Sequence, residues 1–111
     1  MTDPLLTPET YAELADAMGD DFAAELVDTF LADAPNMLND LKTAAAAGDA
    51  DGYRRAAHSI KSNADTFGAT RLAAQARRME LDGLPADTLP IPEIETVYAD
   101  TATALKAMAH G

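Results

Sequence analysis

The chain has 111 residues and a formal net charge of −11, which argues against nucleic acid or an anionic membrane surface as a partner, because binding either requires an excess of Lys and Arg. It contains no cysteine, which excludes disulfide bonds, thiol catalysis and metal sites built on Cys. This length, with a hydrophobic content of 48%, predicts a single globular domain over residues 1–111.

The first predicted helix is short and begins at Thr7-Pro8-Glu9. These three residues fit an N-cap, a proline in the first turn and an acid near the positive end of the helix dipole. Tyr11, Leu14 and Met18 follow at helical spacing. Gly19 is expected to end the helix.

A second, longer helix is predicted from Asp20 or Asp21, either of which can cap it, to Gly48. Its expected buried stripe consists of Phe22, Leu26, Phe30, Met37, Leu38, Leu41 and Ala45. Pro35 falls inside this stripe, removes one backbone donor and is expected to kink the helix. Two helices broken near Asp33 are the alternative. We favour one kinked helix because the apolar stripe continues on both sides of the proline.

The third predicted helix is capped by Asp49, runs to about Phe67 and stops at Gly68. A fourth helix is expected over about residues 69–82. It turns three apolar side chains inward, namely Leu72, Ala76 and Met79.

A loop framed by Gly83-Leu84-Pro85 and Pro90-Ile91-Pro92 precedes the fifth predicted helix. That helix carries one apolar face, formed by Ile94, Val97, Tyr98, Thr101, Leu105 and Met108. One short helix and four longer ones with short connections predict an all-α fold, an antiparallel four-helix bundle with a short extra N-terminal helix.

Only two histidines are available for chemistry. His110 is next to the end of the chain and is expected to be frayed and uninformative. His58 can be placed on a helical wheel, where the apolar residues of its helix lie at about 160–240° from it. These residues are Tyr53, Ala56, Ile60, Ala64 and Phe67. The wheel therefore predicts that His58 points to solvent.

The same wheel places Lys61 and Arg54 within about 60° of His58 on one side, and Arg55 and Ser62 within about 60° on the other. More broadly, six of the eight basic residues fall between positions 54 and 78, where only Asp65 opposes them. They are Arg54, Arg55, Lys61, Arg71, Arg77 and Arg78. A positive patch around an exposed histidine indicates a site for an anion or an acidic partner.

An alternative explanation of the positive patch applies to two of its arginines. Arg77 and Arg78 could simply pair with Glu80, Asp82 or residues of neighbouring helices. In that case their charge would be used within the fold and would contribute nothing to a binding site.

The stretch from Ala57-His58-Ser59-Ile60-Lys61-Ser62 to Phe67-Gly68-Ala69 resembles the signature of histidine-containing phosphotransfer domains. That signature is Ala-His-x-apolar-Lys-(Gly/Ser), followed by an apolar residue and Gly-Ala at the end of the helix. The resemblance covers roughly residues 20–108. It implies that His58 accepts a phosphoryl group and that Lys61 neutralises phosphoryl oxygens.

The resemblance also assigns smaller roles. Ser62 matches the small position that lets a receiver domain approach, although Gly is more frequent there, and Gly68 matches the glycine that ends the helix. Asp65 places a carboxylate about 10 Å from His58 along the helix axis, so its repulsion of a phosphate should be small. We expect the partner-binding surface to include Arg54, Arg55, Ser62 and Asp65.

The function implied by the resemblance is a relay of phosphoryl groups between the aspartates of response-regulator receivers in a multistep phosphorelay. Receivers are the expected partners, with a hybrid histidine kinase as a further candidate, and the resemblance implies a monomer. Mg²⁺ is expected on the receiver, and this chain is expected to need no metal or cofactor. Because it offers no nucleotide-binding motif, we expect a phosphoryl carrier and not an enzyme that uses ATP. Lacking a signal peptide and a long apolar run, the chain is expected to be cytoplasmic.

Two other functions remain open from the sequence. The first is an acidic helical module for protein interaction without phosphotransfer, for which the basic patch is only a docking surface. The second is a hydrolytic enzyme with His58 as general base. This second hypothesis is weaker, because the same helical face offers no nucleophile except Ser62 and no carboxylate to orient the imidazole.

Overall fold

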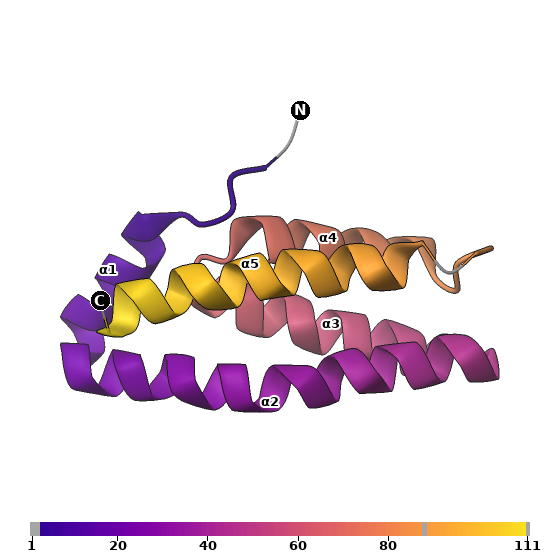
Figure 1. The fold of residues 1–111 in the computed structure, drawn as a ribbon, viewed down its shortest axis with the longest axis horizontal. Helices are drawn as coiled ribbons and strands as arrows, with labels where there is room; N and C mark the ends of the chain where they lie inside the picture. The colour runs from indigo at the N-terminus through magenta and orange to yellow at the C-terminus, as the bar shows by residue number, and fades with distance from the viewer. Residues whose placement is uncertain (1–2, 88, 111) are drawn as a thin grey trace.

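The computed structural model describes residues 3–87 and 89–110, and within them the chain forms five α-helices and no strand (Figure 1). The helices are α1 (Pro8–Met18), α2 (Asp20–Ala47), α3 (Ala50–Thr66), α4 (Thr70–Asp82) and α5 (Pro90–His110). The four longer helices run lengthwise as a bundle, and short α1 lies at the end where α2 begins and α5 finishes. The predicted all-α bundle with an extra N-terminal helix is confirmed. None of these helices combines the length and apolar character that a membrane span requires, as far as the described residues go.

The core joins α2, α5 and the end of α3 through aromatic side chains. The Phe30 ring stacks on Phe67 with centroids 5.4 Å apart and meets Tyr98 edge-on at 6.4 Å. The Tyr98 hydroxyl donates to the Leu31 carbonyl at 3.2 Å. Because burial raises the pKa of Tyr98, this hydroxyl keeps its proton and remains a donor.

The predicted ends of the first and third helices are confirmed. Pro8 occupies the first turn of α1, and the Gly19 N–H closes it on the Ala15 carbonyl at 2.8 Å. Asp49 caps α3 by accepting from the Gly52 N–H at 3.0 Å. Thr7 differs from the prediction, because its hydroxyl makes no cap and bonds instead to the Thr70 hydroxyl at 2.6 Å.

Helix α2 confirms the favoured single helix and corrects two details of the prediction, its N-cap and the burial of Phe22. It starts at Asp20 with Gly19 in the N-cap position, so neither aspartate caps it. It continues through Pro35 without a break, so the alternative of two helices is wrong. Phe22 is 45% exposed, whereas Ala23 and Val27 are buried. The reason is phase, since Phe22 lies about 80° from Phe30 on the helix, at the edge of the buried stripe.

The start of α5 also differs from the prediction. Pro90-Ile91-Pro92 does not frame a loop but forms the first turn of the helix, with Ile91 buried. Proline costs little there, because the first N–H groups of a helix have no partner within the helix. The predicted apolar face is confirmed, with Thr101 fully buried and its hydroxyl donating to the Val97 carbonyl at 2.7 Å.

Gly68 connects α3 to α4 at a turn that packs against the start of α1. Its φ is +70°, and a Cβ built on it would lie 2.6 Å from the Thr7 carbonyl oxygen and 2.7 Å from the Thr10 Cβ. Gly48, after α2, has the same φ of +70° but nothing within 4 Å of a built Cβ. The two glycines therefore share a left-handed conformation but differ in the space around them.

This difference gives a matched pair of stability predictions. We expect Gly48→Ala to lower the free energy of unfolding by about 1 kcal/mol, the usual cost of a left-handed alanine. Gly68→Ala should lose a further ~1–3 kcal/mol, because the methyl group must push α1 away from the turn. Urea unfolding of both variants and the parent checks this. Equal losses would contradict the close approach of Thr7 and Thr10.

Candidate functional site

His58 lies in the middle of α3 with 60% of its side chain exposed. The five apolar residues placed opposite it on the helical wheel are all buried: Tyr53, Ala56, Ile60, Ala64 and Phe67. The orientation predicted from the sequence is confirmed. The imidazole lies on the surface of a helix whose opposite face is packed into the core.

The imidazole of His58 is held from both sides. Its Nδ1 lies 3.0 Å from Oε2 of Glu80, which comes from α4. A carboxylate can only accept hydrogen bonds, so Nδ1 carries the proton in this contact. In the neutral ring Nε2 then keeps a free lone pair, and the Ser62 hydroxyl, 3.4 Å away, can donate to it.

Glu80 is the site residue that the sequence analysis missed. The sequence analysis expects no orienting carboxylate on the helical face of His58, and the structure supplies one from the neighbouring helix α4. A signal was available, since α3 and α4 form a hairpin around a short turn at Gly68 and Ala69. His58 and Glu80 are equally distant from Ala69 along the chain, so an antiparallel hairpin brings them opposite each other.

Lys61 does not stand free beside His58. Its Nζ lies 3.0 Å from Oδ2 of Asp65, one turn further along α3, and its side chain is 33% exposed. Asp65 is expected from the sequence to repel a phosphate on His58 only weakly and to belong to the partner-binding surface, with no role toward Lys61. It instead compensates the lysine charge, so the pair carries no net charge in this conformation.

The two predicted flanking arginines lie on different sides of α3. A Cβ built on Gly83 would come within 3.0 Å of Nη2 of Arg54, which places that guanidinium at the end of α4. Arg55 instead lines a groove between α2 and α3 together with Asp40 and Ser59. The structure therefore does not gather the basic residues into one ring around His58.

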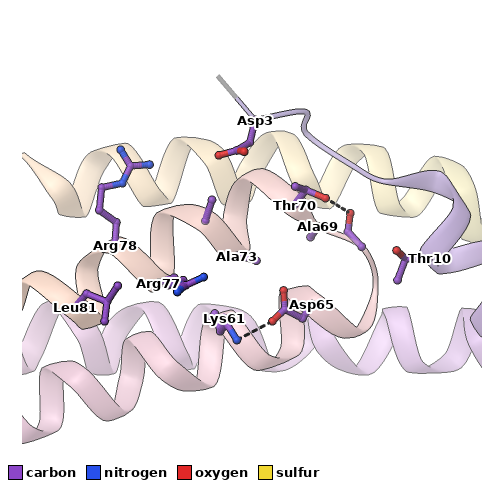
Figure 2. A pocket seen from close by; sticks show the side chains of 12 residues that line it. Asp3, Thr10, Lys61, Asp65, Ala69, Thr70, Ala73, Arg77, Arg78 and Leu81 are labelled. Atoms are coloured by element: carbon purple, nitrogen blue, oxygen red, sulfur yellow. Dashed lines mark hydrogen bonds and ion pairs between the residues drawn. The ribbon is translucent and has the colours of Figure 1, made fainter. Parts of the chain in front are cut away.

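A second groove, of about 580 Å³, lies between α3 and α4 (Figure 2). Lys61 and Asp65 line it from α3, and Arg77, Arg78 and Leu81 line it from α4. Within residues 3–87 and 89–110, neither arginine forms an ion pair. The alternative that they pair with Glu80 or Asp82 is therefore wrong, and Glu80 binds His58 instead.

The second histidine is also ordered by a contact. His110 was expected to be frayed, but it lies in the last turn of α5 with its Nε2 2.8 Å from Oδ1 of Asp28 on α2. In the part of the chain that the structure describes, no group of three or more His, Asp or Glu side chains could hold a metal ion.

The chain is similar to histidine-containing phosphotransfer proteins in sequence and in fold. The sequence model of the Hpt domain family matches residues 25–110. The crystal structure of histidine-containing phosphotransfer protein B (HptB) from Pseudomonas aeruginosa PAO1 matches with a TM-score of 0.88 at 29% sequence identity, over 97% of this chain and 96% of that one. No curated protein sequence gives a significant match.

Proposed function

Because the chain belongs to the Hpt domain family, whose members are histidine phosphotransfer proteins, we propose that His58 is its phosphoacceptor. In this proposal Nε2 receives a phosphoryl group from the aspartyl phosphate of a response-regulator receiver and passes it to another receiver. The observation that carries the proposal is the exposed imidazole whose Nδ1 is bound to Glu80 at 3.0 Å. That contact leaves Nε2 as the nitrogen with the lone pair.

The transfer needs no proton movement from this chain. The Nε2 lone pair attacks phosphorus while the bond from phosphorus to the aspartate oxygen breaks, and that electron pair stays on the receiver's carboxylate. The ring then carries a positive charge with its proton still on Nδ1, and the Glu80 carboxylate offsets that charge. Transfer to the next receiver reverses these steps. Such a reaction depends mainly on in-line positioning and charge compensation.

Two neighbours on α3 complete the site in this proposal. The Ser62 hydroxyl is small and can turn away from Nε2 by a rotation about χ1, which opens the nitrogen for in-line attack. Lys61 must exchange part of its contact with Asp65 for the phosphoryl oxygens, one turn from His58. Mg²⁺ is expected to be supplied by the receiver.

The arrangement of Ser62, His58 and Glu80 matches that of a hydrolase only in part. Ser62, His58 and Glu80 follow each other at 3.4 Å and 3.0 Å, as a nucleophile, base and orienting acid would. Acyl transfer also requires donors aimed at an oxyanion. Ser62 lies inside α3, where neighbouring backbone N–H groups are used by the helix. The geometry therefore favours phosphotransfer.

The test is transfer of radiolabel from a phosphorylated receiver to the purified chain in the presence of Mg²⁺. We expect the label on this chain to be lost in acid and retained in base, as for a phosphohistidine. A panel of receivers that transfers no label would favour the alternative of an interaction module without phosphotransfer. A label that is stable in acid would point to an ester on a hydroxyl group.

A further inference from the structure

The contacts between α3 and α4 fix which residues face each other along the seam. His58 contacts Glu80, and Arg54, one turn earlier on α3, lies against Gly83, which caps the C-terminal end of α4. The helices are therefore antiparallel in this register. One turn beyond His58 in the other direction, the register places Lys61 opposite Arg77, and both line the same groove (Figure 2).

The cations Lys61 and Arg77 in this groove differ in whether a carboxylate pairs with them. Lys61 is compensated by Asp65 at 3.0 Å, whereas Arg77 forms no ion pair with any residue in the described ranges. In the part of the chain that the structure describes, Arg77 is thus a cation without an ion-pair partner, one turn from the His58–Glu80 pair. Leu81, on the same side of α4, is 71% exposed and lines the groove as an apolar contact.

We propose that this groove docks an acidic segment of the partner receiver, with Arg77 pairing with a carboxylate and Leu81 packing against an apolar side chain. The inference rests on the proposed function, because it takes the receiver as the partner. A planar guanidinium suits a carboxylate better than an ammonium does. In a chain of net charge −11, such a groove steers an acidic partner toward one side of His58.

The opposite side of His58 is less suited to this partner. There the groove between α2 and α3 is lined by Arg55 but also by Asp40 and Asp49. This groove sets two carboxylates against one cation, whereas the groove between α3 and α4 sets two carboxylates, Asp3 and Asp65, against three cations, Lys61, Arg77 and Arg78. Of these two grooves, only the one between α3 and α4 carries an excess of positive charge that attracts an acidic segment. The receiver is therefore placed over α4, and its contact with His58 comes from that side.

The decisive variant is Arg77→Glu, compared with Lys106→Glu, which makes the same charge change on the exposed face of α5. We expect the rate of label transfer from the receiver to fall about tenfold in Arg77→Glu and to become less sensitive to salt. Lys106→Glu should remain within about twofold of the parent, because it lies outside the groove. Circular dichroism checks that both variants are folded.

Two results would overturn the inference. Equal rates in Arg77→Glu and Lys106→Glu would exclude the groove as the docking site. An equal fall with phosphoramidate, a small donor that needs no docking surface, would place Arg77 at the phosphoryl group instead. If the parent takes no phosphate from any receiver, the proposed function fails separately. NMR titration with an unphosphorylated receiver then still tests the groove, because shifts there that weaken in Arg77→Glu support it and shifts elsewhere overturn it.

Discussion

Replacement of His58 by Gln is expected to abolish phosphorylation of the chain, whereas His110→Gln should leave it at the level of the parent. Glutamine is polar, and its amide can still donate to Glu80, so the helix surface is preserved. Its nitrogen has no nucleophilic lone pair, because that pair is delocalised into the carbonyl group. Label transfer from a phosphorylated receiver, followed by gel electrophoresis at neutral pH, measures the difference.

The control is well matched because the chain contains two histidines. His110 is half-exposed and bonded to Asp28 at 2.8 Å, so its replacement removes an imidazole–carboxylate contact like that of His58. Retention of label in His58→Gln together with loss in His110→Gln would assign the phosphate to the end of α5. Retention in both variants would move the search to other side chains.

Features that depend on a single helix could be predicted from the sequence. The helical wheel placed His58 outward and Ile60 inward, and both positions are confirmed. The cap residue Asp49 gave the start of α3, whereas the side-chain caps expected for α1 and α2 do not form. The prolines of α5 were misread, because Pro is compatible both with a loop and with a first turn, and local sequence cannot separate the two.

Side-chain contacts between two helices were not predicted, although the bundle itself was. Glu80 reaches His58 only because α3 and α4 pack in one register, which a wheel of either helix does not contain. The pairing of Lys61 with Asp65 has a different origin. Its i,i+4 spacing is visible in the sequence and is typical of an ion pair on one helix, whereas the family resemblance assigns Lys61 to the phosphoryl group. The pairing of Lys61, and with it the net charge beside His58, is therefore known only from the structure.

Glu80→Ala is expected to slow label transfer by about 10- to 100-fold, because a hydrogen bond to a charged group contributes about 1.5–3 kcal/mol. Without the carboxylate, the proton of neutral His58 is shared between Nδ1 and Nε2, and the molecules protonated on Nε2 have no lone pair there to attack phosphorus. Glu80→Gln should show a smaller loss of a few-fold, because its amide oxygen still accepts from Nδ1 while the negative charge is gone.

The position of the proton on the His58 ring shows whether Glu80 orients the imidazole or only stabilises the packing of α3 against α4. ¹⁵N chemical shifts of the His58 ring should report a proton on Nδ1 in the parent and in Glu80→Gln, and a mixture of both tautomers in Glu80→Ala. Lost packing between α3 and α4 would lower stability without changing the tautomer. Normal transfer with an unchanged tautomer in Glu80→Ala would contradict the role of Glu80. A slow variant with mixed tautomers would show that Glu80, on α4, determines which ring nitrogen of His58, on α3, accepts the phosphoryl group.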